Sequence, residues 1–137
     1  MKKILFFLLI IFAFLQANNF RDGMLFYKNS DFKKAKKSFE LAISQDNAMQ
    51  ANFMLGKMYL YGEGVSPQRD KAIQYLKKAS QNGNIRANCY LSEAYLKNNT
   101  NRDKIISLLK KGLEKNLKEC KKIKKIYDIK IKQGKMK

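Results

Sequence analysis

Residues 59–80 read YLYGEGVSPQRDKAIQYLKKAS and place a glycine-rich loop between two segments with helical patterning. A phosphate-binding loop follows a strand and sets Lys-Ser or Lys-Thr directly after its last glycine, and neither feature is found here. The loop therefore has a structural role. Gly62 suits the left-handed conformation that ends a helix, Gly64 lets the chain reverse without a clashing Cβ, and Val65 is expected to enter the core.

The segments around this loop recur along the chain. A shift of 36 residues aligns ANFMLGKMYL at 51–60 with ANCYLSEAYL at 87–96, and a shift near 33 aligns Gly23 with Gly56. Self-similarity at this period is typical of helical repeat proteins. Each repeat is predicted to be a pair of amphipathic helices, an A helix and a B helix, because no segment shows the sustained alternation that indicates strands.

Capping residues mark where the helices begin. Asp31 is expected to cap the B helix of the first repeat. In the second repeat, Ser66 is expected to cap the B helix, with Pro67 at its first position. The predicted fold is all-α, an alpha-alpha superhelix of about three helical pairs over residues 18–116.

A basic segment, residues 117–137, follows the repeats. Its apolar residues share one helical face: Leu117, Cys120, Ile123, Tyr127 and Ile131. A solenoid needs a terminal element that buries its open end and presents a polar side to water, so we expect a capping helix and a short tail. Alternatively, this lysine-rich helix binds a membrane surface or another anionic partner.

Residues 56–87, GKMYLYGEGVSPQRDKAIQYLKKASQNGNIRA, resemble the Sel-one-like repeat (SLR) family of the secreted bacterial type, a longer-looped relative of the tetratricopeptide repeat. The matching positions are Leu55, Gly56, Tyr59, Gly62, Gly64, Val65, Lys71, Ala72, Tyr75, Lys78, Ala79 and Gly83. The outer repeats depart from the pattern, because the first lacks the Gly-x-Gly loop and the third has Asn98-Asn99-Thr100 in its place.

The resemblance implies a concave groove formed by the inner faces of the A helices. Aligned through the repeats, this groove is expected to carry Phe20, Met24, Tyr27, Phe53, Lys57, Tyr61, Cys89, Glu93 and Lys97. Aromatic and methionine side chains interleaved with lysine suit an extended peptide of acidic character. The predicted function is an adaptor for another protein or peptide, as a monomer or weak homodimer. Alternatively, Phe20, Phe53 and Tyr61 only pack between neighbouring helices.

Residues 1–17 are expected to be a secretory signal peptide. Lys2 and Lys3 precede an unbroken apolar run of 12 residues at 4–15. As a helix this run spans roughly 18 Å, short of the hydrocarbon core of about 30 Å, and Ala17 offers the small residue that a signal peptidase requires. We expect export to the periplasm or beyond, with an uncleaved membrane anchor as the alternative.

The chain is strongly basic, with 29 Lys and Arg, 11 Asp and Glu and a formal net charge of +18 at pH 7. Such a field attracts anionic polymers and surfaces, although nucleic acid is a poor partner for an exported protein. The other interpretation is compositional, with lysine filling the solvated faces. The sequence leaves both interpretations open.

Catalytic, metal and cofactor sites are not predicted. The chain has no His, the usual general base at neutral pH, and two cysteines do not make a zinc site. Cysteine-rich secreted relatives suggest a β-lactamase or penicillin-binding alternative, and Ser-x-x-Lys occurs at Ser30 and at Ser107. The partner motifs Ser-Asp-Asn and Lys-Thr-Gly are missing, so no residue is assigned a catalytic role.

Cys89 and Cys120 leave the question of a disulfide open. An exported setting permits one. Cys120 lies on the apolar stripe of the last helix, whereas Cys89 lies away from the face that carries Ala87 and Leu91. The sequence therefore does not decide whether the two are joined.

Overall fold

The computed structural model describes residues 18–97 and 102–132. The expected signal peptide, the Asn98-Asn99-Thr100 segment and the C-terminal tail lie outside these residues. The described part consists of helices without a strand: α2 (Asn19–Lys28), α3 (Phe32–Ser44), α4 (Ala51–Tyr61), α5 (Arg69–Gln81), α6 (Ile85–Lys97), α7 (Arg102–Glu114) and α8 (Lys118–Lys132). None of these helices is long and apolar enough to span a bilayer.

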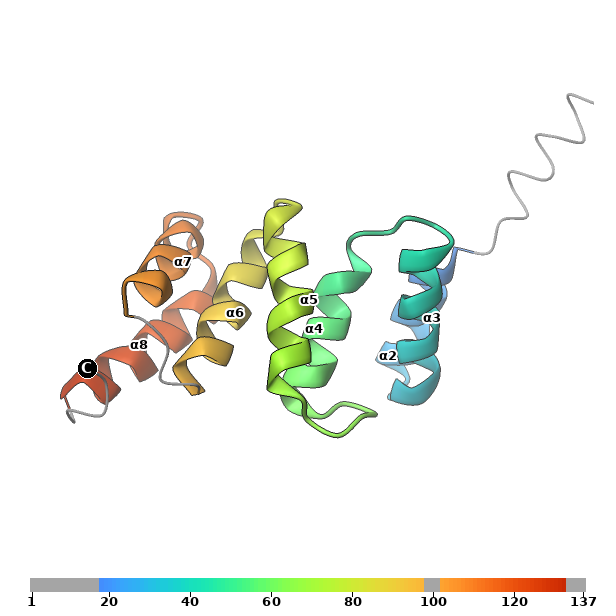
Figure 1. Ribbon diagram of the computed structural model, residues 1–137, viewed down its shortest axis with the longest axis horizontal. Coiled ribbons are helices and arrows are strands. Elements are labelled where there is room, and N and C mark those ends of the chain that lie inside the picture. The colour runs from blue at the N-terminus through green and yellow to red at the C-terminus, as the bar shows by residue number, and fades with distance from the viewer. Residues whose placement is uncertain (1–17, 98–101, 133–137) are drawn as a thin grey trace, which may run out of the picture.

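The helices form a repeat solenoid. α2 packs on α3, α4 on α5 and α6 on α7, and contacts of α3 with α4 and of α5 with α6 connect each pair to the next. Figure 1 shows the pairs side by side in one row, with α2 and α4 behind α3 and α5. The predicted all-α fold of helical pairs is confirmed.

The helix starts follow local capping in part. The Asp31 side chain accepts a hydrogen bond from the Lys34 backbone N at 3.2 Å, so the predicted start of α3 is confirmed. The predicted start of α5 is wrong, because this helix begins at Arg69, after the extended residue Gln68. Pro67 lies in the loop instead, and its ring covers Gly62, where an added Cβ would lie 2.7 Å from the Pro67 Cγ.

The glycine loop between α4 and α5 joins the two helices of the second repeat and contacts the first repeat. Gly62 has a φ of 75° and ends α4, and Gly64 has a φ of 70°. An added Cβ on Gly64 would lie 2.5 Å from the Cβ of Phe32 and 2.8 Å from its backbone carbonyl carbon. Val65 is half-buried and packs against the core. The loop therefore packs closely against the start of α3 in the preceding repeat.

Small residues let the two helices of a pair approach closely. An added Cβ would lie 2.7 Å from the Phe39 ring at Gly23, and 2.6 Å from the Leu76 Cγ at Gly56. Phe39 and Leu76 are both fully buried, one in each of the two core clusters. The two glycines that the repeat alignment equates thus make room for a large side chain of the B helix.

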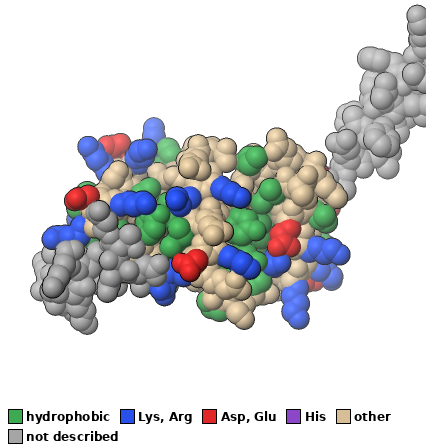
Figure 2. All heavy atoms as spheres, in the orientation of Figure 1, with side chains coloured by type: hydrophobic (Ala, Val, Ile, Leu, Met, Phe, Trp, Pro, Cys, Tyr) green, Lys and Arg blue, Asp and Glu red, His purple; other side chains and the backbone are tan. Residues whose placement is uncertain are grey.

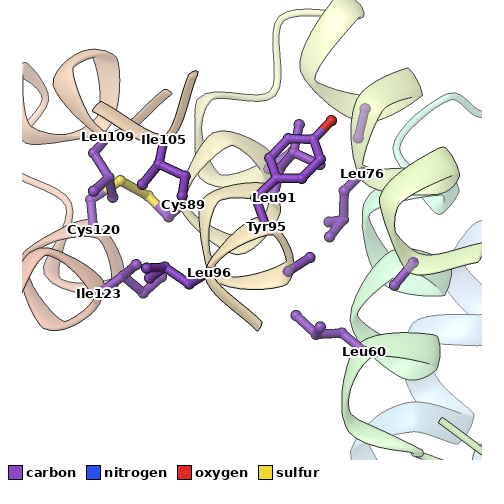
Figure 3. Packing of buried hydrophobic residues seen from close by; sticks show 14 of the residues in the cluster. Leu60, Leu76, Cys89, Leu91, Tyr95, Leu96, Ile105, Leu109, Cys120 and Ile123 are labelled. Atoms are coloured by element: carbon purple, nitrogen blue, oxygen red, sulfur yellow. A yellow bond between two sulfur atoms is a disulfide. The ribbon is translucent and has the colours of Figure 1, made fainter. Parts of the chain in front are cut away.

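A disulfide joins Cys89 of α6 to Cys120 of α8, with 4.8 Å between the Cα atoms. Figure 3 shows the bridge among the buried side chains between these helices. Both cysteines are fully buried, because α6 is covered by α7 and by α8. The expectation that Cys89 points away from the core is wrong, since α8 makes a second buried side on α6.

α8 covers the end of the array. It packs on α6 and α7, and Cys120, Ile123 and Tyr127 of its apolar face are buried. Gly112 of α7 lies against the disulfide, where an added Cβ would come within 2.9 Å of the Cys89 Sγ. The last helix is thus part of the C-terminal core.

Candidate functional site

Side chains from α2, α4 and α6 and from the loop after α4 contact one another along one side of the solenoid. We call this set the A-helix strip, and it consists of Tyr27, Lys57, Tyr61, Glu63, Tyr90 and Glu93. All members except Tyr61 are half-buried, and Tyr61 is 43% exposed. The strip therefore presents ordered aromatic and charged groups to solvent.

Lys57 is the centre of the strip. Its Nζ lies 5.3 Å from the ring centroid of Tyr27 and 5.7 Å from that of Tyr90. The same nitrogen donates a hydrogen bond to the Tyr27 hydroxyl at 3.3 Å. Cations within about 6 Å of an aromatic face are attracted by the ring quadrupole. One ammonium group thus links α2, α4 and α6.

Two tyrosine hydroxyls hold two carboxylates. The Tyr27 hydroxyl donates to Oε2 of Glu63 at 2.6 Å, and the Tyr61 hydroxyl donates to Oε2 of Glu93 at 2.7 Å. Burial and the hydrogen bond to Glu63 raise the pKa of Tyr27, and burial and the bond to Glu93 raise the pKa of Tyr61. Both phenols therefore remain protonated donors near neutral pH.

A pocket of about 290 Å³ lies where the strip meets α8. Tyr61, Tyr90 and Glu93 form one side, and the remaining lining residues come from α8: Glu119, Lys122, Ile123 and Ile126. The Tyr61 and Tyr90 rings meet edge to face, with 6.1 Å between centroids. Burial raises the pKa of Tyr90, and the nearby carboxylates of Glu119 and Glu93 raise it further. The pocket is smaller than most drug-sized ligand sites and has the size of one or two side chains.

The structure brings together part of the predicted groove. Tyr27, Lys57, Tyr61 and Glu93 lie in the strip. Phe53 supports it from the core side, with its ring centroid 5.4 Å from that of Tyr90, and contacts both core clusters.

The other predicted groove residues lie elsewhere. Phe20 and Met24 pack against the N-terminal core, and the Phe20 ring centroid is 5.8 Å from that of Phe39. Cys89 is buried in the disulfide and does not line the strip. The side chain of Lys97 lies outside the described part of the structure. Phe20 and Phe53 thus pack against the core, as the alternative interpretation expects, and their contact with a partner stays a prediction.

Sequence reasoning missed Tyr90 and the α8 side of the pocket. Tyr90 precedes Glu93 by three residues and so shares its helical face, a signal that the sequence contains. Glu119 and Lys122 carry no comparable signal, because their place beside α6 depends on how the last helix packs. Glu63 of the glycine loop was not among the predicted groove residues, and it accepts the hydrogen bond of the Tyr27 hydroxyl.

The two Ser-x-x-Lys matches are separate and exposed. Ser30 lies in the turn between α2 and α3 with a φ of 61°, and Ser107 lies on α7. Both serines, and Lys33 and Lys110 with them, are exposed, which is not the shaped setting of an activated nucleophile. Within residues 18–97 and 102–132, no three His, Cys, Asp or Glu side chains are grouped to hold a metal ion.

Comparison with known families matches residues 50–84 to the Sel1 repeat. The matched segment contains α4, the glycine loop and α5, and so includes Lys57, Tyr61 and Glu63 of the strip. This match supports a place among Sel1-like repeat proteins, whose repeats generally mediate protein–protein interactions. No solved structure matches the chain.

Proposed function

We propose that this protein is an exported adaptor that binds a segment of another protein along the A-helix strip. The observation that carries the proposal is the position of the Lys57 ammonium group between the rings of Tyr27 and Tyr90. The strip holds its own side chains in place, so little rotamer entropy is lost when a partner binds. Tyrosine is also enriched among the residues that contribute most to interface affinity.

Two features support export. Residues 1–17 have the pattern of a signal peptide. The chain also carries a disulfide between Cys89 and Cys120, and disulfides persist mainly in oxidising compartments such as the periplasm and the extracellular space. The protein acts there as a monomer or a weak homodimer.

The test is crosslinking in the source organism with the full chain tagged at its C terminus. The Tyr61→Ala variant removes an exposed ring of the strip, and Ile106→Ala removes a similarly exposed side chain of α7, 48% exposed. We expect one crosslinked protein to be lost from Tyr61→Ala and kept by Ile106→Ala. Equal recovery by both variants would contradict the proposal, and fractionation of the same cells tests export.

Phe53→Ala is unsuitable for this test. Its half-buried side chain contacts both core clusters, and removing an aromatic ring from the core costs up to about 3 to 5 kcal/mol of stability. Loss of partner binding by that variant would report on folding and not on the strip.

Binding to an anionic surface through α7 and α8 is a second candidate, favoured by an uneven distribution of charge. Residues 102–132 contain 12 basic and 4 acidic residues, whereas the longer segment 18–97 contains 13 basic and 7 acidic residues. A compositional bias alone would spread the excess of basic residues evenly along the chain. Figure 2 shows Lys and Arg side chains scattered over the face that it displays. No comparable observation favours the hydrolase alternative.

A further inference from the structure

We infer that two copies of this protein associate through a groove between α7 and α8, the end groove, and form a symmetric dimer. Figure 1 shows these two helices at one end of the row, with α2 at the other end. The groove has a volume of about 480 Å³. The dimer would present two A-helix strips, and only this last consequence rests on the proposed function.

The end groove carries four apolar side chains. Leu109 and Leu113 of α7 and Tyr127 of α8 belong to its lining, together with Ile106 of α7, which is 48% exposed. Leu109 and Tyr127 are buried in the core, whereas Leu113 is half-buried. Burial of apolar surface is the dominant favourable term in most protein association. A partner that covers Ile106 and Leu113 therefore gains free energy from this groove.

The position of the end groove suits a helix as the occupant. Within the array, α4 lies between α3 and α5, and α6 packs on both α5 and α7. α8 packs on α6 and α7 and is the last helix of the described part. Solenoids bury the face of each helical pair against the next pair. A helix of a second copy, placed against α7 and α8, continues this stacking.

The charges of the lining distinguish a second copy from an anionic partner. Lys110 and Glu114 of α7 and Lys124 and Asp128 of α8 line the groove, so cations and carboxylates are equal in number. Residues 102–132 as a whole contain 12 basic and 4 acidic residues. An anionic surface or an acidic segment would meet Glu114 and Asp128 at this place and be repelled by them. The lining is thus balanced in a region that is otherwise basic.

This balance permits two basic molecules to meet. At physiological ionic strength, charges interact over about 8 Å, so the charges at the contact matter more than the net charge of the chain. The neighbouring lysines Lys111, Lys121 and Lys125 are exposed and lie outside the lining. They can remain in water when the grooves of two copies face each other.

A two-fold axis makes the charges of the lining self-complementary. In an isologous interface, each contact between two different residues occurs twice, once in each direction. Lys110 and Glu114 are exposed and four residues apart, so they share one side of α7. Two antiparallel α7 helices can therefore pair Lys110 of each copy with Glu114 of the other. Lys124 and Asp128 already form an ion pair within one copy, at 2.6 Å.

The dimer leaves the A-helix strip open. The strip consists of side chains of α2, α4, α6 and the loop after α4, and it shares no residue with the lining of the end groove. Two strips in one particle bind two copies of a partner segment, and linked sites of this kind strengthen overall binding when both are engaged. Dimerisation would thus make the adaptor bivalent.

The experiment is analytical ultracentrifugation of the disulfide-bonded protein purified from the source organism, so that residues 1–17 are present or removed as in the cell. We expect a monomer–dimer equilibrium in the micromolar to millimolar range of weak association. Species larger than a dimer are not expected, because an isologous contact closes on itself. Ile106→Ala should weaken the dimer about tenfold or more, since each interface loses two such side chains.

A charge exchange tests the pairing across the two-fold axis. Lys110→Glu and Glu114→Lys should each weaken the dimer about fivefold to thirtyfold, because each change replaces two ion pairs by two repulsive pairs. The double variant restores opposite charges and should return to within about twofold of the parent protein. Lys77→Glu on α5 makes the same charge change as Lys110→Glu at a distant exposed position and should not weaken the dimer. Variants are compared only when their helical circular dichroism equals that of the parent.

The outcomes separate this inference from the proposed function. A protein that stays monomeric, grows into longer polymers, or forms a dimer that none of the α7 variants weakens would overturn the end-groove dimer. A monomer whose Ile106→Ala variant loses binding to anionic vesicles or to another protein would assign the groove to that partner and also overturn it. Tyr61→Ala should dimerise like the parent protein. If it dimerised normally and still captured the crosslinked partner, the adaptor function alone would fail.

Discussion

Cys89 of α6 and Cys120 of α8 are joined by a disulfide that fixes the last helix to the third repeat, with 4.8 Å between the Cα atoms. This bridge also sets one side of the pocket, because Glu119 and Lys122 flank Cys120 on α8. The covalent link therefore connects the stability of the end of the solenoid to the geometry of the candidate site.

Removing the disulfide should destabilise the C-terminal end of the protein. The bridge closes a loop with a sequence separation of 31 residues, and closing a loop of this length contributes about 3 to 4 kcal/mol in the chain-entropy account. Cys89→Ala/Cys120→Ala should lower the free energy of urea unfolding by about that amount. Hydrogen exchange should rise first in α7 and α8, since repeat arrays are stabilised mainly by neighbours.

A reductant provides the control for this prediction. It should destabilise the unmodified protein and leave the double alanine variant unaffected. If the variant exchanged no faster in α8 than the parent protein does, the bridge would not hold the last helix.

Gly64 should be far more sensitive to substitution than Gly83, although both have a left-handed backbone, with φ of 70° and 83°. A Cβ on Gly64 would lie 2.5 Å from the Phe32 Cβ, whereas a Cβ on Gly83 meets nothing within 4 Å. We expect Gly83→Ala to cost about 1 to 2 kcal/mol, the backbone strain alone, and Gly64→Ala to cost about 1 to 3 kcal/mol more through overpacking. Urea unfolding of the two variants measures the difference, and equal losses would show that the loop does not pack tightly on α3.

Much of the fold could be predicted because repeats and caps are local signals. The self-similarity around Gly56 and Leu91 predicted the helical pairs, and Asp31 marked the start of α3. The predicted start of α5 was wrong because Pro67 packs over Gly62 in the loop. Capping preferences do not take such a loop contact into account.

The candidate site was only partly predictable. Lys57 and Glu93 could be placed on one face because the repeat shift relates them directly. The pocket residues of α8 could not be placed in this way. This helix lies outside the repeat pattern, so its residues cannot be aligned with those of the A helices. Periodicity also gives one buried stripe per helix, whereas α6 has neighbours on several sides, and this is why Cys89 was placed at the surface.

The raised pKa values of Tyr27 and Tyr61 predict a delayed tyrosine titration in the folded protein. Their ordinary pKa is 10.0, and burial together with hydrogen bonds to Glu63 and Glu93 raises it in the folded state. A raised folded pKa means that this stabilisation is complete below the unfolded value, near pH 10, and is lost as pH rises through the folded value. Folding stability should therefore fall above about pH 10.

Tyrosinate absorbance against pH measures this directly, because lysine side chains do not contribute to the signal. The folded protein should ionise at higher pH than the same chain in urea. Tyr27→Phe and Tyr61→Phe should each remove part of the late component. Coincident curves for the folded and unfolded protein would contradict the buried, hydrogen-bonded placement of these rings.

Binding to anionic surfaces, if it resides in α8, should depend on the exposed lysines of that helix. Lys118, Lys121 and Lys125 are exposed, and each lysine near an anionic membrane is worth about 1 kcal/mol. Changing all three to Gln should weaken binding to phosphatidylserine-containing vesicles about 100-fold at low salt, and reduce the salt dependence of what remains. The matched control changes Lys33, Lys37 and Lys77, which are exposed on α3 and α5. An equal loss in the control would mean that net charge alone attracts the vesicles, and salt-insensitive binding by the unmodified protein would exclude an electrostatic surface altogether.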